Sequence, residues 1–415
     1  MSILSIPVDW SELLPQGLPT PCFVVDEDRL SANLSVLSSI QERTGAKVLL
    51  ALKGFAMFST FPLLKKVLHG VCASSPDEAR LGREEFNKEV HVFAAAYSDN
   101  DMRELAELAD HIVFNSFAQL ERFLPLLRQK QQAREQSPNK SPHAGGVSAF
   151  GPKGIEIGLR LNPEHSEGAV PIYDPCSPGS RLGIRKAAFN GKTAEDLRLL
   201  GVDGLHFHTL CEQDAAPLAR TLAAVEEKFG EFLPGMRWLN FGGGHHITRP
   251  GYDVDLLCEC IMRARDAYGV QVYLEPGEAV ALNSGVLVST VLDVVEADMP
   301  VVILDTSAAA HMPDVLEMPY RPEAVGAGQP GEKAWTCRLA GKSCLAGDVI
   351  GEYSFTGPLR TGDRIVLLDM AHYSMVKTNT FNGLGLPGIA LLQRGTHELR
   401  MVRKFGYEDF KSRLS

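Results

Sequence analysis

The sequence lacks three features that mark large classes of proteins. It has no excess of basic residues, since Lys and Arg total 41 against 51 Asp and Glu, a formal charge of −10. Proteins that bind the phosphate backbone of nucleic acid usually carry a basic surface. No apolar run reaches membrane-spanning length, and the first twenty residues contain no basic start followed by an apolar stretch. We therefore expect no secretory signal, and neither nucleic acid nor membrane as a partner.

Cysteine is present but lacks the spacing of a structural role. The eight cysteines are scattered along 415 residues, without CxxC pairs or the density of a disulfide-linked scaffold. We expect reduced thiols and a cytoplasmic location. Apolar residues make up 45% and charged residues 22%, the balance of an ordinary globular protein, and the length favours two domains.

Short β-branched runs alternate with segments that carry apolar residues at helical spacing. The eight runs are Lys47 to Leu52, Val71 to Ser74, Val90 to Ala94, His111 to Phe114, Ile155 to Leu161, Val202 to His208, Arg237 to Phe241 and Val272 to Glu275. Eight strand-then-helix units predict an α/β fold, a (β/α)8 TIM-like barrel, in which catalytic groups lie at the carboxyl ends of the strands. A doubly wound open sheet is the alternative.

The pattern of predicted secondary structure changes near residue 285. Strand-like pieces such as Val286 to Val294, Val301 to Leu304 and Arg364 to Leu368 are separated by Gly and Pro turns, which is typical of a β-rich domain. We therefore expect a barrel over residues 28–284, and a β domain formed by residues 1–27 and 285–415. Residues 136–154, rich in Ser, Pro, Gly and Lys, predict a mobile loop between barrel units.

Three polar features follow predicted strands. Lys53 closes the first strand, where a lysine that simply reaches solvent would be the commoner situation. Glu275 ends the eighth strand, and a buried carboxylate there is costly unless it meets a cation or a hydrogen-bond donor. Gly242, Gly243 and Gly244 follow the seventh strand, where barrels frequently bind phosphate, although glycine runs are also plain turns.

Four histidines lie near the ends of the sixth and seventh predicted strands. The sixth strand ends at His208, whose imidazole could stack on a flat ring, and alternation puts His206 on the same side. His245 and His246 follow the glycine triplet. Together they raise the possibility of zinc, but no CxxC or HExxH arrangement accompanies them, so we expect no metal.

A lysine, a phosphate-binding turn, a carboxylate and a stacking imidazole around one barrel mouth are the parts that hold pyridoxal 5'-phosphate. The lysine forms the Schiff base, and the carboxylate keeps the pyridine nitrogen protonated so that the ring accepts electrons from a broken bond. We therefore expect this cofactor.

Longer stretches of sequence support the same expectation. They are ALKGFAMFS from Ala51, ASSPDEARLGREEF from Ala73, GLHFHTLCEQ from Gly204, FGGGHHITRP from Phe241, EPGEAVALN from Glu275, HMPDVLEMPYRP from His311, CLAGDVIGEYSF from Cys344 and MAHYSMVKTNTFNG from Met370. In these stretches the chain resembles the fold-type III pyridoxal-phosphate decarboxylases, the alanine-racemase-like group. It is most similar to the members that decarboxylate carboxynorspermidine and carboxyspermidine in polyamine biosynthesis.

The resemblance implies a role for each matching residue of the cofactor site. Lys53 matches the Schiff-base lysine, and His208 matches the imidazole that stacks on the ring. Glu275 matches the partner of the pyridine nitrogen, the glycine triplet matches the phosphate loop, and Tyr373 matches a tyrosine that contacts phosphate.

The resemblance also implies a homodimer with shared active sites, in which Cys344 comes from the neighbouring subunit. Considered alone, a cysteine is by default a small buried apolar residue. We assign Cys344 as the acid that reprotonates the α-carbon after carbon dioxide leaves, with Lys53 as the competing candidate.

Two acids are the expected substrate-binding residues. Relatives that act on ornithine or diaminopimelate commonly have an Arg where this chain has Glu278. An acid there suits a substrate with amines, although a solvated surface Glu is the plainer interpretation. Asp314, in the run Pro313, Asp314, Val315, is the second acid. The sequence leaves the choice between carboxynorspermidine and carboxyspermidine open, because one methylene changes binding little.

Other functions fit parts of the pattern. A decarboxylase of ornithine, lysine or diaminopimelate is the main alternative. An amino-acid racemase usually has an Arg at the pyridine nitrogen, so Glu275 argues against it. A non-catalytic pyridoxal-phosphate carrier would not need a second domain that bears Cys344, and a zinc hydrolase built on the histidines is the weakest alternative.

Overall fold

The structure is a computed structural model that describes residues 10–136, 154–168, 170–396 and 398–415. The chain divides into two compact units, one made of residues 34–280 and the other of residues 1–33 with 281–415. The loop predicted over residues 136–154 lies, except for its two end residues, outside the described residues.

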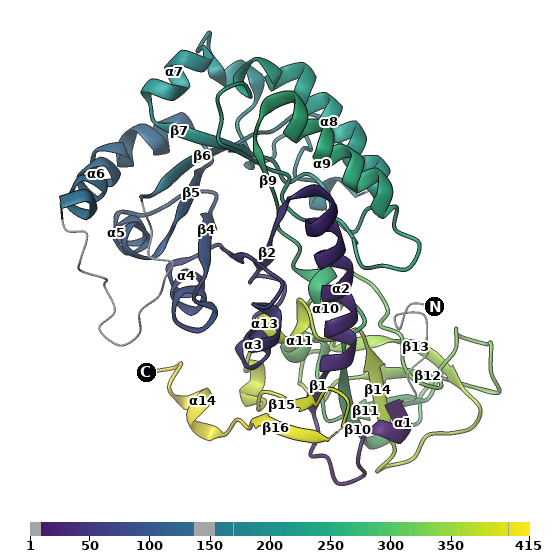
Figure 1. The fold of residues 1–415 in the computed structure, drawn as a ribbon. Helices are drawn as coiled ribbons and strands as arrows, with labels where there is room; N and C mark the ends of the chain where they lie inside the picture. Colours follow the sequence, from purple (N-terminus) through teal and green to yellow (C-terminus); the bar gives the residue numbers. More distant parts are fainter. Residues whose placement is uncertain (1–9, 137–153, 169, 397) are drawn as a thin grey trace. The chain divides into compact units, whose positions relative to one another are not determined.

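The unit of residues 34–280 is a closed barrel of eight parallel strands (Figure 1). In barrel order these are β2 (Lys47–Ala51), β3 (Gly70–Ala73), β4 (Glu89–Phe93), β5 (His111–Phe114), β6 (Glu156–Arg160), β7 (Val202–His206), β8 (Trp238–Asn240) and β9 (Gln271–Leu274). The pairing of β2 with β9 closes the ring. All eight predicted strands exist, and the barrel prediction is confirmed over the open sheet.

Helices connect the strands of the barrel. They are α3 (Phe61–Leu64), α4 (Pro76–Leu81), α5 (Asp99–Leu108), α6 (Phe117–Gln136), α7 (Ala194–Leu199), α8 (Ala215–Phe229) and α9 (Val254–Tyr268), while α2 (Glu27–Thr44) and α10 (Glu278–Ala281) cross the boundary between the units. Short 3-10 turns occupy 58–60, 171–173, 186–189, 230–232 and 381–383, and a π turn occupies 82–86.

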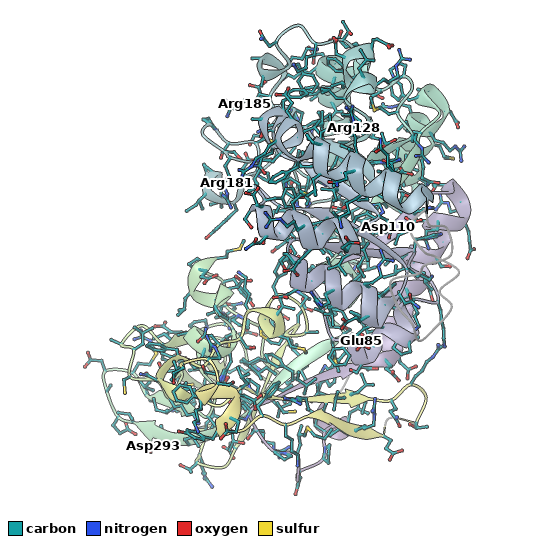
Figure 2. All side chains as sticks on the ribbon, turned by 90° about the vertical axis from the view of Figure 1, so that its left-hand side faces the viewer. Glu85, Asp110, Arg128, Arg181, Arg185 and Asp293 are labelled. Carbon is teal, nitrogen blue, oxygen red and sulfur yellow. The ribbon has the colours of Figure 1, made fainter. Side chains whose placement is uncertain are left out.

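The helix ends follow from local sequence. Ser98 and Asp101 form a reciprocal capping box at the start of α5. Asp214 caps α8, because its side chain accepts from the amide of Ala215. After α4, the guanidinium of Arg83 donates to the last carbonyl of α5 and lies 2.7 Å from the carboxylate of Asp110, which is labelled in Figure 2. These contacts hold the outer helices in register with β4 and β5.

The middle of the barrel is filled by one large side chain. Trp238 of β8 is fully buried and packs with Leu49, Val113 and Tyr273. Its indole needs space on two neighbouring strands, since a Cβ added at Gly158 or Gly204 would lie 2.3 or 2.0 Å from its ring atoms. The two glycines on β6 and β7 are therefore packing residues that admit the tryptophan.

The other unit contains an eight-stranded mixed sheet. Its strands are β1 (Cys22–Asp26), β10 (Gly285–Val295), β11 (Val301–Leu304), β12 (Trp335–Ala340), β13 (Val349–Phe355), β14 (Arg364–Leu368), β15 (Gly388–Leu392) and β16 (Leu399–Arg403). β10 organises the sheet, because residues 286–290 pair with β14, its first part pairs with β1, and residues 291–295 pair with β11 beyond an irregularity. The predicted β-rich domain is confirmed.

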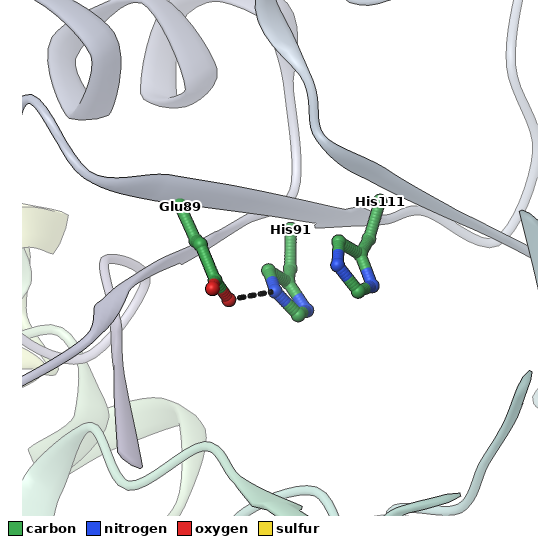
Figure 3. A group of neighbouring side chains, drawn as sticks. All are labelled: Glu89, His91 and His111. Carbon is green, nitrogen blue, oxygen red and sulfur yellow. Dashed lines mark hydrogen bonds and ion pairs between the residues drawn. The ribbon is translucent and has the colours of Figure 1, made fainter. Parts of the chain in front are cut away.

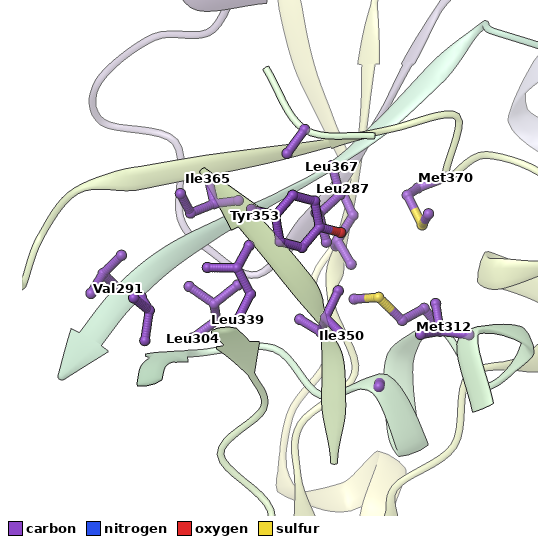
Figure 4. Close-up of a cluster of buried hydrophobic side chains, with 14 of the residues drawn as sticks. Leu287, Val291, Leu304, Met312, Leu339, Ile350, Tyr353, Ile365, Leu367 and Met370 are labelled. Atoms are coloured by element: carbon purple, nitrogen blue, oxygen red, sulfur yellow. The ribbon is translucent and has the colours of Figure 1, made fainter. Parts of the chain in front are cut away.

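This unit has its own apolar core (Figure 4). Leu287, Leu304, Leu339 and Leu367 come from four different strands and are fully buried around Tyr353. The phenol of Tyr353 donates to the carbonyl of Pro322 at 2.7 Å, which satisfies its hydroxyl inside the core. Short helices complete the unit: α1 (Trp10–Leu13), α11 (Ala308–His311), α12 (Asp314–Glu317), α13 (Ser374–Lys377) and α14 (Tyr407–Lys411).

Two further sequence expectations concern the whole chain. The eight cysteines are all free thiols, as expected. Among the described residues, no helix combines the length and the apolar character needed to span a bilayer.

The packing of Trp238 predicts the effect of one methyl group. Gly204→Ala would place a Cβ inside the indole ring, so we expect the free energy of unfolding to fall by about 1–3 kcal/mol. Urea unfolding followed by tryptophan fluorescence measures this loss. Gly357→Ala is the control, since a Cβ there meets no atom within 4 Å. Equal stability of the two variants would contradict the role assigned to Gly204.

Candidate active site

Lys53 lies two residues beyond the end of β2, at the carboxyl end of the barrel. Its side chain is exposed to solvent over part of its surface. Its amine nevertheless lies among many protein atoms, as is typical of a side chain at a barrel mouth. Burial lowers the pKa of the ammonium, and the charge of Arg160 lowers it further, against the opposing effects of Cys72 and Glu275. A lysine with a lowered pKa more readily presents the neutral amine that attacks a carbonyl.

Two glycines hold the loop of Lys53 against the end of β9. A Cβ on Gly54 would lie 3.1 Å from the Cα of Gly277, and a Cβ on Gly277 would lie 3.1 Å from the carbonyl oxygen of Ala51. The amide of Ala51 donates to the carbonyl of Pro276 at 3.0 Å. The missing side chains therefore bring the Lys53 loop and the Glu275 segment together where the barrel closes.

Glu275 follows β9 directly and is 6% exposed. One carboxylate oxygen accepts from the amide of Asn240 at 2.7 Å, and the other lies 3.2 Å from Nε2 of His206. Cys72 of β3 is a further hydrogen-bond partner, through its thiol. Burial alone would raise the pKa of Glu275, but His206 and Asn240 lower it to about 2. The carboxyl group is therefore ionised although it is buried.

The imidazole of His206 is the donor in this pair. Burial lowers the pKa of His206, and the neighbouring carboxylate opposes that shift only in part. A neutral ring with its proton on Nε2 satisfies both observations, because it donates to Glu275 without adding a second buried charge.

His208 lies two residues beyond β7, so the predicted strand was too long by two residues. Its Nδ1 accepts from the amide of Gly243 at 3.0 Å, which leaves the proton of the neutral ring on Nε2. Burial holds the pKa of His208 well below its usual value, and the charges of Lys53 and Arg160 add to this effect. The ring is therefore neutral and held in one orientation.

Two of the three predicted amides of the glycine turn have partners within the chain. The amide of Gly242 donates to Asn240 at 2.8 Å, and that of Gly243 donates to His208. A Cβ on Gly242, Gly243 or Gly244 would lie within 2.6 Å of the backbone or side chain of the neighbouring strand ends. Glycine is therefore needed at these three positions because neighbouring segments pack closely against them. Gly242 and Gly244 also have positive φ, which glycine adopts readily.

Glu278 begins α10, three residues after Glu275. Its carboxylate lies 3.1 Å from Nε2 of His246 and its side chain is 19% exposed. Its amide lies next to Gly54, in the same contact that joins the ends of β2 and β9. The predicted acid is therefore placed at the carboxyl end of the barrel, beside the loop of Lys53.

The remaining predicted site residues belong to the other unit. Asp314 begins α12 and accepts from the ammonium of Lys377, which lies 3.1 Å from Glu317 as well. Although partial burial of Lys377 would lower its pKa, these two acids raise it. Asp314 thus has a cationic partner in its own chain, which the sequence did not predict.

Cys344 and Tyr373 have different surroundings in this unit. Cys344 is exposed on a loop, and its amide donates to the side chain of Asn382 at 2.8 Å. The buried carboxylate of Asp348 accepts from the hydroxyl of Ser343 at 2.6 Å and holds that loop. Tyr373 has a φ of +52°, a conformation that non-glycine residues rarely adopt outside functional or tightly constrained sites.

Sequence reasoning missed three residues around the barrel mouth. Arg160, the last residue of β6, is 5% exposed, donates to the carbonyl of His208 at 2.8 Å and lies over the ring of Phe93. Burial lowers its pKa to about 10, although Glu275 opposes the shift. Asn240 and Cys72 contact Glu275. Arg160 and Asn240 end their strands, so applying the strand-end rule to every strand would have found both.

Comparison with known proteins adds a family. Residues 22–371 match the family described as pyridoxal-dependent decarboxylase, C-terminal sheet domain. A carboxyaminopropylagmatine decarboxylase of Synechocystis is 44% identical over 400 residues, which are 96% of each chain. A carboxynorspermidine/carboxyspermidine decarboxylase of Campylobacter jejuni is 42% identical over 409 residues, 96% of this chain and 99% of the relative.

Solved structures agree with this result. The carboxynorspermidine decarboxylase of Campylobacter jejuni, complexed with norspermidine, superposes with a TM-score of 0.82 at 41% identity, covering 95% of this chain and 100% of that one. The diaminopimelate decarboxylase of Helicobacter pylori has a TM-score of 0.75 at 17% identity, covering 97% of this chain and 98% of that one. The second likeness concerns the fold alone.

The environment of Glu275 predicts a pH-dependent defect. Asn240→Asp keeps the acceptor for Gly242 but replaces the donor to Glu275 with a second carboxylate 2.7 Å away. The two acids then share a proton, and the pKa of one rises. Because a carboxyl with a raised folded-state pKa destabilises the fold as pH rises above its unfolded value, about 3.9 for Asp, the defect should grow with pH.

Thermal unfolding of both proteins between about pH 5 and about pH 8 measures this difference. Asn100→Asp, which places a carboxylate at an exposed position, is the control and should show no such trend. A constant difference in Tm between wild type and Asn240→Asp over this range would show that Glu275 is not an ionised partner of residue 240.

Proposed function

The chain belongs to the pyridoxal-dependent decarboxylases, and on that premise we propose that it removes the carboxyl group of a carboxylated polyamine, carboxynorspermidine or carboxyspermidine. The family membership rests on a match over residues 22–371 and on relatives that are 38–44% identical over nearly the full chain. Carboxyaminopropylagmatine is the second candidate substrate, because the 44% identical relative bears that name.

The residues at the barrel mouth fit pyridoxal phosphate. Lys53 offers an amine with a lowered pKa, Glu275 offers an ionised acceptor, and His208 offers a neutral ring in a fixed orientation. When bound, the cofactor supplies an electron sink for the bond that releases carbon dioxide. Lys53 would attach it covalently, and Glu275, supported by His206 and Asn240, would hold a proton on its ring nitrogen.

The glycine turn offers fewer amide donors to the phosphate group of the cofactor than the sequence suggested. Gly242 and Gly243 already donate within the chain, so we propose that Gly244 and the hydroxyl of Tyr373 are the principal contacts. The positive φ of Tyr373, a non-glycine residue, supports this role, since strained backbone is concentrated at ligand sites.

We further propose that the protein is a cytoplasmic homodimer and that Cys344 protonates the α-carbon from the neighbouring subunit. The exposed thiol of Cys344 lies on a loop that Asp348 holds, next to the exposed side chain of Leu345. Eight free thiols support a reducing compartment. Lys53 remains the competing acid, because its amine lies at the reacting end of the barrel.

Substrate amines need anionic partners. Glu278 is the first choice, since its carboxylate lies 3.1 Å from His246 and its amide lies beside the Lys53 loop within the barrel. Asp314 is the second, although a substrate amine would have to share it with Lys377. Both acids would repel the cofactor phosphate, so a cationic polyamine chain is the better match.

The attachment of the cofactor to Lys53 is directly testable. Borohydride reduction of the purified holoenzyme should place the cofactor label on the peptide that contains Lys53, as mass spectrometry of a digest will show. Lys53→Ala should lose the visible absorbance of the bound cofactor together with activity. Lys66→Ala, which removes an exposed lysine on the following helix turn, should retain both. A label on any other lysine would refute the assignment.

The substrate proposal predicts that Glu278→Gln separates substrate binding from cofactor binding. Charge-assisted hydrogen bonds contribute about 1.5–3 kcal/mol, so kcat/KM for carboxynorspermidine should fall roughly ten- to hundredfold. Cofactor affinity, titrated into the apo-protein, should change little. Glu227→Gln, at an exposed position of α8, is the matched control. Asp314→Asn should have a smaller effect because Lys377 already compensates its charge.

The same assay distinguishes the candidate substrates. Wild-type protein is incubated separately with carboxynorspermidine, carboxyspermidine, carboxyaminopropylagmatine, ornithine, lysine and diaminopimelate, and the products are identified by mass spectrometry. Faster turnover of a simple amino acid than of all three carboxylated polyamines would overturn the proposed function. Normal kcat/KM in Glu278→Gln with weakened cofactor binding would overturn only the role of Glu278.

A further inference from the structure

A second polar cluster lies inside the barrel at its amino end, away from the strand ends that carry Lys53 and Glu275. Glu89 and His91 come from β4, and His111 is the first residue of β5 (Figure 3). One ligand atom from each of the three residues lies within 4.8 Å of the other two. None of these residues has a part in the decarboxylation described above.

The chemistry of this cluster is that of a divalent metal site. His91 and His111 are 1% and 6% exposed, and the Nδ1 atoms of both rings are buried without a hydrogen-bond partner in the described part of the chain. Two imidazoles and one carboxylate are a ligand set that Zn²⁺ commonly uses.

The other ring nitrogens face carboxylates. Nε2 of His91 lies 3.3 Å from Glu89, and Nε2 of His111 lies 3.9 Å from Glu156. Metal-bound histidines usually have a carboxylate partner outside the ligand set, which orients the ring and selects the tautomer, and Glu156 has this position beside His111. Glu89 also accepts from the hydroxyl of Tyr273 at 3.2 Å, and its side chain is 28% exposed, so an ion can reach the cluster from solvent.

Lys47 is the internal competitor for the carboxylate. Its ammonium lies 2.6 Å from Oε1 of Glu89 and 3.3 Å from the hydroxyl of Tyr273. The rings of His91 and His111 are nearly parallel, with centroids 3.7 Å apart and an angle of 13° between planes, so they must tilt for their lone pairs to converge. The affinity for a cation therefore depends on displacing Lys47 from Glu89.

We propose that His91, His111 and Glu89 bind one divalent transition-metal ion of the zinc type, in competition with the ammonium of Lys47. The ion would join β4 to β5 at the amino end of the barrel, where residues of this fold serve stability rather than catalysis. Its binding would stabilise the folded barrel by mass action.

The experiment adds Zn²⁺ to the cofactor-loaded protein, removes excess by gel filtration and measures bound zinc by elemental analysis. Wild type should retain about one more ion per chain than the double variant His91→Asn, His111→Asn, whose affinity should be weaker roughly tenfold or more. His69→Asn is the control, because His69 is a partly buried histidine bonded to Gln41 outside the cluster. It should bind as wild type does.

Lys47→Met gives a result of the opposite sign and does not remove a ligand. Loss of the competing ammonium should tighten Zn²⁺ binding and enlarge the rise in Tm that Zn²⁺ causes. Zinc on the exposed thiols of Cys211 and Cys344 would be equal in all variants. Equal zinc content in wild type and the double variant, or weaker binding in Lys47→Met, would overturn the proposal.

Cobalt provides a readout that does not depend on variants that fold poorly. Co²⁺ bound by two imidazoles and a carboxylate should give visible absorption bands without the intense charge-transfer band of thiolate ligation. These bands should be present in wild type and His69→Asn. A spectrum of thiolate-bound or fully hydrated cobalt in the wild-type protein would also overturn the proposal.

Discussion

The carboxylate of Glu275 is the constraint on which the mouth of the barrel depends. A buried anion is stable only when donors surround it, and here those donors come from three strands: Cys72 from β3, His206 from β7 and Asn240 from β8. Each donor must lie at the same level of the barrel as Glu275. The hydrogen bonds to the Glu275 carboxylate therefore require a particular register of these strands. An ionised, buried carboxylate is also the kind of group that active sites use.

The two ends of the barrel use their polar groups differently. At the carboxyl end, burial and nearby cations lower the pKa values of Lys53 and His208, while Glu275 is ionised. At the amino end, the charges of Glu89 and Lys47 compensate each other beside two stacked imidazoles. The side chains around Trp238 pack between the strands of the same barrel.

The second unit is stabilised mainly by apolar packing. Its sheet is organised along β10, and its core is almost entirely apolar around Tyr353. Cys344 and Tyr373, to which we propose roles in the reaction, lie in loop segments of this unit, Cys344 exposed and Tyr373 with a positive φ. A rigid sheet that carries adaptable loops is a common arrangement for residues that complete a site.

The sequence by itself determined the elements and the family. Local periodicity was enough to predict all eight barrel strands, because strand patterns repeat within a few residues. Strand ends also indicated Lys53 and Glu275. The helix that carries Glu278 was not predicted, nor was the early end of β7 before His208, since turns at strand ends depend on neighbouring backbone.

Tertiary structure alone decided which side chains meet. Cys72 reaches Glu275 only because β2 pairs with β9 and closes the ring, and Asn240 reaches it through the pairing of β8 with β9. Two amides of the glycine turn are occupied only because His208 and Asn240 lie beside them. Lys377 finds Asp314 across 63 positions of sequence. Such contacts join residues far apart in the chain, so no local pattern encodes them, and they exist only once the strands are in register.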